Sequence, residues 1–429
     1  MKTRAMDVVI ENRNHLTNAQ PTVLLISTTP SFSPARLAMA LARTGFELVA
    51  ICPKRHPLCQ TRSVRKVFLY RCLTPMRSIK KAIQIAKPDL LVPCDDWAAC
   101  LLHQLYQRET SKAGQLSVLA RLIEHSLGSP QNFQLAYERA TLLKIAQEQG
   151  IRVPRIQALS SLKDIRGWAR DVGFPAVLKA DSTSGGEGVR IVKTSSEAEH
   201  AFRSLEAPPL LAKAIKRVLF DQDMALLWPS LLRKRYTVNI QTFVSGRDAT
   251  SAVVCWYGQV LASLHFEVLK KQDAKGPSTV LRVVENQEMS QAVEKMARRM
   301  NLSGFHGFDF ILETGNGHAH LIEMNPRATQ VGHLALGAGH DLAAALIATI
   351  TGREIAAAKA TEKDTIVLFP QELLNDPASE YLQSGYHDVP SEDPEFVSAC
   401  LKRVQKRRSS NWIPAWLKNL QKFSSSSEQ

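Results

Sequence analysis

The amino-acid sequence predicts an α/β protein of two or three structural units, the first of which is built on a parallel sheet. Residues 22–93 alternate short apolar runs with helical patterns, which is typical of a parallel sheet with helices on its faces. From about residue 151 the pattern changes to short strands, turns and helices. The length of 429 residues, with 45% hydrophobic and 22% charged residues, allows more than one core.

The first unit is expected to begin with the strand Thr22–Ser27, an apolar run of the buried type. A helix over Pro34–Arg43 follows, with Ser33 at its N-cap and Gly45 at its end. The loop after the first strand, TTPSFS, lacks the GxGxxG pattern, so the Rossmann-like rhythm does not predict a dinucleotide site. The remaining elements expected here are strands Phe46–Cys52 and Asp89–Pro93 and a helix Met76–Ala86.

The rest of the chain is expected to begin with mainly helical structure over residues 97–150. Gly150 and Pro154 close a helix that contains Arg139 and Lys144. Residues 353–429 are expected to hold the strand Thr365–Phe369, an acidic turn and a basic helix. Residues 1–20 and the final SSSSEQ are expected to be loose tails.

The formal net charge is +14, from 54 Lys and Arg against 40 Asp and Glu. The excess is scattered, and its densest runs, Arg233–Arg235 and Lys402–Arg408, contain no aromatic residues. Short charged runs of this kind usually form solvated faces, so the sequence favours that interpretation over nucleic-acid binding. Nucleic-acid binding remains the alternative, and a homo-oligomer is left open.

Cysteine usage and hydropathy indicate a cytoplasmic protein. The seven cysteines are odd in number and form no CxxC pair, which favours buried thiols in a reducing compartment. The first 16 residues contain no apolar core of the signal-peptide type. The longest apolar stretch, Leu334–Ile350, carries His340 and Asp341, so no membrane span is expected.

A loop rich in small residues follows the apolar strand that ends in Lys179 and Ala180. A lysine at the end of such a strand needs an anionic partner if it is buried. Small residues let backbone N–H groups approach an anion closely, although no Walker A lysine follows. The alternative is a flexible hairpin beside a lysine that reaches solvent. The loop residues singled out for a phosphate clamp are Ser184, Gly185, Gly186 and Gly188.

A second pattern predicts a β-hairpin. The strands Gly307–Leu312 and His320–Asn325 flank the turn TGNGH, a strong hairpin signal. If the hairpin is centred on Asn316, Asp309 lies directly opposite Glu323. Phe308 and Phe310 would then share the core face with Ile322 and Met324.

The opposite face of this hairpin would carry Asp309, Glu323 and Asn325. Facing carboxylates repel each other, and a divalent cation removes that repulsion. Oxygen ligands of this type suit Mg²⁺ or Mn²⁺ rather than zinc. The alternative is a solvent-facing hairpin with arginine or lysine neighbours.

The segment GFDFILETGNGHAHLIEMNPR, residues 307–327, resembles the metal-binding hairpin of ATP-grasp enzymes. The nearest resemblance is to carbamoyl phosphate synthetase, with biotin carboxylase and D-alanine–D-alanine ligase further off. The match rests on the D…E-x-N-P-R pattern, and the resemblance covers about residues 22–352. It implies that Asp309, Glu323 and Asn325 bind two Mg²⁺ ions and that Arg327 holds the transferred phosphoryl group or an acyl phosphate.

The resemblance also implies an ATP site. Arg139, eleven residues before Gly150, and Lys179 match the two basic residues that contact ATP phosphates, with Lys144 as an alternative to Arg139. The run Ile240–Asp248 resembles the adenine hinge, with Gln241 where the family often has glutamate. Residues implied to contact adenosine are Gln241, the backbone of Thr242 and Val244, and Asp248, which would accept from the ribose hydroxyls.

Substrate residues are harder to assign. Cys94-Asp95-Asp96 ends a predicted strand at the edge where open α/β sheets bind ligands, although a helix N-cap explains Asp95 or Asp96 equally well. Arg282 is a candidate for holding phosphate or a substrate carboxylate, and a surface arginine is the alternative. His306 is expected to be packed rather than catalytic.

The implied architecture is an open α/β domain over residues 21–125 and a two-lobed ATP-grasp domain over 126–352, with lobes 126–205 and 206–352. A C-terminal extension covers residues 353–429. The implied activity is an ATP- and magnesium-dependent ligation, in which a carboxylate becomes an acyl phosphate and an amine or similar nucleophile displaces phosphate. The alternatives are a bicarbonate-activating, carbamoyl-phosphate-type enzyme and an ATP-binding regulatory module without turnover.

Overall fold

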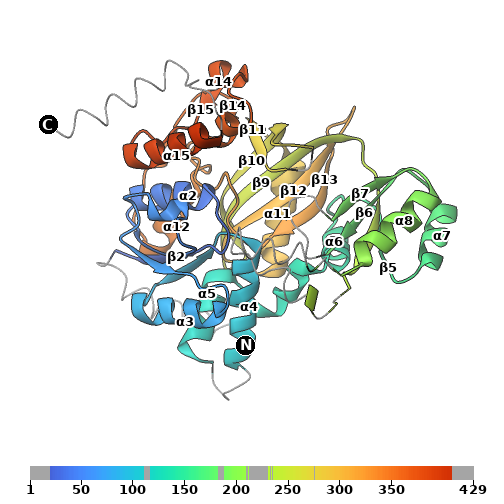
Figure 1. Ribbon diagram of the computed structural model, residues 1–429, viewed down its shortest axis with the longest axis horizontal. Coiled ribbons are helices and arrows are strands. Elements are labelled where there is room, and N and C mark those ends of the chain that lie inside the picture. The colour runs from blue at the N-terminus through green and yellow to red at the C-terminus, as the bar shows by residue number, and fades with distance from the viewer. Residues whose placement is uncertain are drawn as a thin grey trace.

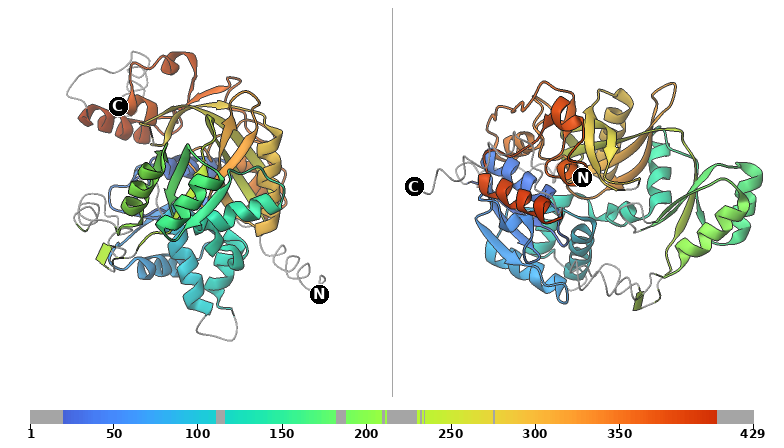
Figure 2. Two further views of the ribbon diagram at one scale, coloured as in Figure 1. Left: turned by 90° about the vertical axis from the view of Figure 1, so that its right-hand side faces the viewer. Right: turned by 45° about the horizontal axis from the view of Figure 1, so that its top comes forward.

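The computed structural model describes residues 20–110, 116–181, 188–208, 211, 230–231, 233, 235–274 and 276–407. Three sheets organise the described part of the chain, two of them four-stranded and one seven-stranded. The small sheet near the middle of the sequence lies at one end of the molecule, and the first and last segments of the chain lie together at the other (Figures 1 and 2). Of the predicted tails, residues 1–19 and the final SSSSEQ lie outside the described residues.

The first sheet is parallel throughout, as the alternating sequence pattern predicts. Its strand order is β3-β2-β1-β4, so β2 and β3 lie on one side of β1 and β4 lies on the other. The residues that face inward on its strands and helices are apolar and buried. The elements are β1 (Thr22–Ile26), α2 (Ser33–Arg43), β2 (Glu47–Cys52), β3 (Lys66–Leu69), α3 (Pro75–Ala86), β4 (Leu90–Pro93), α4 (Asp96–Thr110) and α5 (Val118–Leu127).

Two local expectations for this unit need correction. Ser33 is the first residue of α2 rather than its N-cap, which is Phe32 and makes no side-chain cap hydrogen bond. Pro34 at the second helical position fixes a helical φ there, so the helix starts without that cap. The short edge strand β3 was not predicted, because its residues are largely exposed and lack the apolar character of its neighbours.

The small sheet is antiparallel and has the order β5-β8-β6-β7. Helices α7 and α8 cover one of its faces, where Trp168, Ile165 and Phe202 are buried. Residues from both sides of the predicted lobe boundary at 205/206 contribute strands to this sheet, because β8 pairs with β5 and β6. The elements are α6 (Arg139–Glu148), which precedes it, β5 (Ile156–Leu159), α7 (Leu162–Asp171), β6 (Ala176–Ala180), β7 (Val189–Val192), α8 (Ser195–Glu206) and β8 (Val238–Thr242).

The seven-stranded sheet has the order β13-β12-β9-β10-β11-β14-β15. Helix α11 packs on one face, and helix α12 packs between the other face and α2. The register of the hairpin β12–β13 confirms that Asp309 lies opposite Glu323. The elements are β9 (Gly246–Trp256), β10 (Gln259–Lys271), β11 (Ser278–Val283), α11 (Gln287–Met300), β12 (Gly304–Glu313), β13 (Ala319–Asn325) and α12 (Leu342–Thr351).

The packing predicted for the other face of this hairpin is wrong in one position. A bulge follows the Asp309–Glu323 pair, so Phe310 lies opposite Leu321, and Ile322 is the extra residue. Leu321 and Met324 are buried in the core beside Phe308, whereas Ile322 is half-buried. Strict alternation of side chains along a strand leaves no place for an added residue, so the sequence pattern put Ile322 on the core face.

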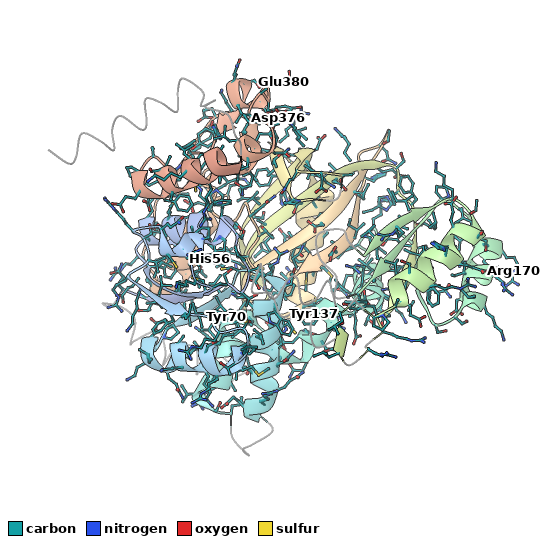
Figure 3. All side chains as sticks on the ribbon, in the orientation of Figure 1. His56, Tyr70, Tyr137, Arg170, Asp376 and Glu380 are labelled. Carbon is teal, nitrogen blue, oxygen red and sulfur yellow. The ribbon has the colours of Figure 1, made fainter. Side chains whose placement is uncertain are left out.

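The C-terminal segment, residues 353–407, is built into the core. Strand β14 extends the large sheet beside β11, and Phe369 and Phe396 are buried in the same hydrophobic core as α2 and α12. Lys270 forms ion pairs of 2.7 Å with both Glu372 and Asp376, the latter labelled in Figure 3. The elements are β14 (Thr365–Val367), α13 (Gln371–Asn375), α14 (Tyr381–Ser384), β15 (Tyr386–His387) and α15 (Pro394–Arg407).

Two further features concern the described residues as a whole. Their helices include none that is both long enough and apolar enough to cross a bilayer. All seven cysteines are free thiols, and the Sγ atoms of Cys52 and Cys59 lie 3.8 Å apart.

His306 is packed, as expected: it is 3% exposed, and its Nε2 lies 2.8 Å from the Ser303 carbonyl oxygen.

Candidate active site

Asp309, Glu323 and Asn325 lie together on the face of the β12–β13 hairpin that points away from the α11 core. Asp309 accepts hydrogen bonds from the Thr250 hydroxyl at 2.9 Å and the Asn325 amide at 3.0 Å. Burial and the negative charge of Glu323 both raise the pKa of Asp309. The pair therefore carries the repulsion that its spacing predicts.

Arg139, the first residue of α6, lies against this pair. Its side chain is 9% exposed and donates to Glu323 Oε1 at 2.8 Å and to Asp181 Oδ1 at 3.1 Å. The arginine neighbour that the sequence left open as an alternative to a metal is thus present, and its charge partly offsets the facing carboxylates. Lys144 is exposed further along α6, so Arg139 is the basic residue of this helix that joins the cluster.

Lys179 enters the same region from the small sheet. It lies opposite Asn239 on β8, and Val177 lies opposite Gln241, so these side chains share one face. Burial and the nearby Arg139 charge lower the pKa of Lys179 to about 8. Among the described residues, no acceptor lies within hydrogen-bonding distance of its ammonium group. The side-chain oxygens of Asn239 and Gln241 are also buried without a partner there.

The loop that follows Lys179 is described only at its ends. Ser184, Gly185 and Gly186 lie outside the described residues. Gly188 is buried, and its carbonyl oxygen accepts a 2.9 Å hydrogen bond from the Ala180 amide, which closes the loop at its base. The loop therefore starts and ends beside Lys179.

The predicted adenine hinge connects the small sheet to the large sheet. Its residues 243–245 run between β8 and β9. The Thr242 amide donates to the Arg155 carbonyl at 2.9 Å, so this amide is not available to a ligand. The Thr242 carbonyl is the backbone group that could accept a hydrogen bond from a ligand. No hydrogen bond of the Val244 amide occurs within the described residues. Asp248, on β9, forms an ion pair with Lys271.

Arg327 and Arg282 differ in their surroundings. Arg327 donates from Nε to Asp96 Oδ1 at 2.9 Å, and its Nη2 lies 3.4 Å from Asn325 Oδ1, so it bridges the first unit and the hairpin. Arg282 is 45% exposed and lies 3.9 Å from Asp364. No contact in the described part of the chain joins Arg282 to the cluster around Glu323.

The two acidic residues at the end of β4 have separate roles. Asp95 accepts from the amide and the hydroxyl of Thr28, both at 2.6 Å, and from the Ala98 amide at 2.9 Å. It therefore caps α4 and anchors the loop after β1. Asp96 has a half-exposed side chain and contacts Arg327. Of the two candidates, Asp96 lies beside the site and Asp95 supports the fold.

The sequence interpretation missed Asp181, Asn239 and Thr250. Asp181 Oδ1 accepts from Asn239 at 2.9 Å as well as from Arg139, so it orients both side chains. Asp181 lies two residues after Lys179, and this spacing on an extended segment was an available signal. Asn239 and Thr250 had no local signal, because their roles depend on which distant strands pair.

The chain was also compared with known proteins. Residues 138–358 match the family model described as the carbamoyl-phosphate synthase L chain, ATP binding domain. The carbamoyl phosphate synthase large chain of Thermotoga neapolitana is 23% identical over 357 residues, which is 79% of this chain and 30% of that protein. A formate-dependent phosphoribosylglycinamide formyltransferase of Bacteroides fragilis is 23% identical over 276 residues, 62% of this chain and 60% of that protein.

Solved structures show the same fold. A biotin carboxylase–β,γ-ATP complex from Campylobacter jejuni has a TM-score of 0.56 at 15% identity, covering 79% of this chain and 72% of that one. N5-carboxyaminoimidazole synthetase from Staphylococcus aureus has a TM-score of 0.54 at 13% identity, covering 79% and 80%. The family match covers the residues that build the cluster, from Arg139 through Arg327. The chain therefore belongs to the ATP-grasp family that contains the ATP-binding domain of the carbamoyl-phosphate synthase L chain.

Proposed function

We propose that this chain uses ATP to activate a carboxylate as an acyl phosphate and then joins it to an amine or a similar nucleophile. ATP would lie between the small sheet and the hairpin β12–β13. In this proposal residues 21–125 form an open α/β domain that helps bind the substrates, and residues 126–352 form a two-lobed ATP-grasp domain. The lobes predicted as 126–205 and 206–352 share the small sheet, because β8 pairs with β5 and β6. Residues 353–429 were predicted as an extension, and their described part, residues 353–407, completes the large sheet through β14.

The observation that carries the proposal is the meeting of two cations with an oxygen-rich face. Arg139 and Lys179 come from α6 and the small sheet, whereas Asp309, Glu323 and Asn325 come from the large sheet. Lys179 is 7% exposed, and burying an ammonium group without a close partner is costly, so an anionic ligand would stabilise it. A bound phosphate chain supplies that charge.

The residues present also fit a magnesium ion. No group of three or more His, Cys, Asp or Glu side chains in the described ranges forms a metal cage. Two carboxylates and an amide make a smaller set, and Mg²⁺ usually takes one or two carboxylates and completes its shell with water and phosphate oxygens. When bound, the ion would neutralise phosphate charge that develops during transfer. Asp309, Glu323 and Asn325 are the residues that would hold it, as one ion or two.

Arg139 and Lys179 would hold the phosphate chain. Gln241, the Thr242 carbonyl, the Val244 amide and Asp248 would contact adenosine.

A carboxylate oxygen of the substrate attacks the γ-phosphorus, the bond to the β,γ-bridging oxygen breaks, and ADP leaves. The amine nitrogen then attacks the acyl carbon, phosphate leaves, and the nitrogen loses a proton. Positioning and charge neutralisation account for this chemistry without a nucleophilic side chain.

Arg327 would hold the acyl phosphate. In the structure its Nε contacts Asp96, so its guanidinium already lies at the boundary between the first unit and the metal-binding face. A turn of its side chain toward phosphate would leave Asp96 available to a cationic substrate group. Arg282 would bind a substrate carboxylate only if that substrate extends to the C-terminal end of β11, where Arg282 is partly exposed.

The test is to measure ADP and phosphate released from Mg-ATP by the purified chain, with pools of carboxylic acids, bicarbonate and amines. Hydroxylamine is added to trap acyl phosphates as hydroxamates. ADP release that depends on one acid, with its hydroxamate, supports the proposal and names the acid. Dependence on bicarbonate would instead place the chain with the carboxylating relatives. AMP with pyrophosphate would overturn the acyl-phosphate route.

A further inference from the structure

Asp388, directly after β15 in the C-terminal segment, joins three parts of the molecule. Its side chain is 2% exposed, and its two oxygens have different partners. Oδ1 accepts from Arg36 Nη2 at 2.7 Å, and Oδ2 lies 2.6 Å from His333 Nε2. Arg36 belongs to α2 of the first unit, and His333 lies six residues after Arg327. One carboxylate therefore contacts both the first unit and the segment that follows Arg327.

The charges in this cluster favour a fixed arrangement. Burial lowers the pKa of His333, which favours the neutral imidazole, and with the ring proton on Nε2 the histidine donates to Asp388. Burial alone would raise the pKa of Asp388, but the charge of Arg36 and the contact with His333 hold that pKa below its usual value. The Nε and Nη1 atoms of Arg36 are buried without a partner among the described residues, so Arg36 depends on Asp388 for compensation.

The segment from Arg327 to His333 is held at several points. The Ala328 amide donates to the Pro93 carbonyl at 3.0 Å, at the end of β4. The Gln330 side chain donates to the Ser278 hydroxyl at 2.6 Å. His333 fixes the far end through Asp388. The backbone on which Arg327 is mounted is thus anchored to the first unit, to β11 and to the C-terminal segment.

Further contacts fix the C-terminal segment on the first unit. The Asp393 carboxylate accepts from the Thr61 hydroxyl at 2.7 Å. Arg403 donates to the Arg55 carbonyl at 2.9 Å and lies over the Phe32 ring, 5.6 Å from its centroid. Phe32 precedes α2 in the loop after β1, whose first residues Asp95 anchors. The segment is therefore a fixed support from which Asp388 can act.

We infer that Asp388 is a positioning residue: through His333 it sets where Arg327 lies, and so enables the site to distinguish a nucleotide with a γ-phosphoryl group from one without. The inference rests on the proposed function, in which Arg327 contacts the transferred phosphoryl group. It assigns a role to the C-terminal segment, which supplies no residue of the proposed ATP site. Side chains that orient metal ligands typically cost roughly 10- to 100-fold in affinity or activity when mutated, and an effect of the same order is expected for the side chain that orients Arg327.

Asp388 itself is a poor test, because Asp388→Asn would leave Arg36 buried without its counter-charge and could unfold the chain. His333→Leu is sharper. It removes the donor to Asp388, keeps a similar side-chain volume and leaves the Arg36–Asp388 pair intact. His333→Gln keeps an N–H donor and serves as the conservative variant. Glu395→Gln removes the negative charge from the exposed Arg62–Glu395 pair in the same segment and is the matched control.

The measurement is the affinity of the full chain for Mg-ADP and for Mg-AMP-PNP by isothermal titration calorimetry. We expect His333→Leu to weaken Mg-AMP-PNP binding roughly tenfold or more, with Mg-ADP changed less than about twofold. His333→Gln and Glu395→Gln should bind both nucleotides like the wild type.

Equal affinities in His333→Leu and the wild type, or an equal loss for both nucleotides, would overturn the inference while leaving the proposed function intact. A wild-type chain that binds neither nucleotide would overturn the proposed function, and the inference with it. Circular dichroism and the melting temperature of each variant show whether a loss reflects unfolding.

Discussion

Arg139 donates to Glu323 Oε1 at 2.8 Å, so a cation from α6 meets the hairpin that carries the facing carboxylates Asp309 and Glu323. The same guanidinium also contacts Asp181. In the structure Arg139 therefore offsets part of the repulsion that a divalent cation would otherwise relieve. The two roles are linked, since a residue that holds phosphate in the proposed function is also the one that neutralises the metal ligands.

This relationship predicts how Arg139→Met responds to magnesium. Without Mg²⁺ the variant should be less stable by about 2–3 kcal/mol, at the low end for a broken buried ion pair because the Glu323 side chain is 35% exposed. Mg²⁺ should raise its melting temperature more than that of the wild type, since the ion then supplies the missing charge. Thermal unfolding against MgCl₂ concentration, at constant ionic strength, measures both effects.

Arg152→Met is the control for this experiment. Arg152 is 44% exposed and lies 3.4 Å from Glu288, away from the facing carboxylates. It should lose little stability and respond to Mg²⁺ like the wild type. If Arg139→Met and Arg152→Met respond alike, the carboxylate pair does not bind the ion.

Lys179 predicts the pH dependence of nucleotide binding. Burial and the Arg139 charge lower its pKa to about 8, and bound phosphate favours its charged form. The group is charged below pH 8, so affinity for Mg-AMP-PNP should be nearly constant there. Above pH 8 binding must take up a proton, and affinity should fall by up to roughly tenfold per pH unit. Calorimetric titrations from pH 7 to pH 9.5 test this.

Lys179→Arg tests whether the Lys179 ammonium group, rather than another titrating group, causes this pH dependence. Arginine stays charged throughout this range, so the variant should lose the decline above pH 8 even if its affinity is lower. A decline of the same slope in the variant would assign the pH dependence to another residue.

Gly307 supports the segment after Arg327 by close approach. A Cβ atom built on Gly307 would lie 2.2 Å from Thr329 Cγ2, so Gly307→Ala must displace Thr329. We expect a loss of about 1–3 kcal/mol, typical of overpacking. Gly167→Ala is the matched control: the position lies inside α7 with no atom within 4 Å of the added Cβ, and alanine there should stabilise by about 0.5–1 kcal/mol. Urea unfolding of both variants checks the opposite signs.

Local patterns predicted the hairpin because the chemistry that defines it is local. The Gly-Asn-Gly turn and the alternation of its strands predict the hairpin itself. The pairs nearest the turn, Ile311–His320 and Leu312–Ala319, are centred between Gly315 and Asn316 rather than on Asn316, and the bulge restores the predicted pairing of Asp309 with Glu323. The bulge that puts Leu321 rather than Ile322 in the core depends on an added residue that no alternation contains. The parallel first sheet was predictable for the same reason as the hairpin, since its strands and helices alternate over short distances.

Other parts of the site depend on pairings between distant segments. Asp181 and Asn239 meet because β6 pairs with β8, nearly 60 residues later. Strand β14 pairs with β11 across more than 80 residues, and Asp388 reaches Arg36 across 352. Such contacts are set by packing of the whole core, which a single sequence does not display. The C-terminal segment was therefore expected to be an extension, although it is part of the fold.

The most direct test of the central claim is the magnesium dependence of AMP-PNP binding in the wild type and in Glu323→Ala. We expect the wild type to bind AMP-PNP tightly only with Mg²⁺. Glu323→Ala should lose that dependence while its circular dichroism spectrum is unchanged, because Glu323 lies at the surface of the hairpin and half-exposed rather than in the core. Unchanged magnesium-dependent binding in Glu323→Ala would contradict the assignment of this hairpin as the metal and ATP site.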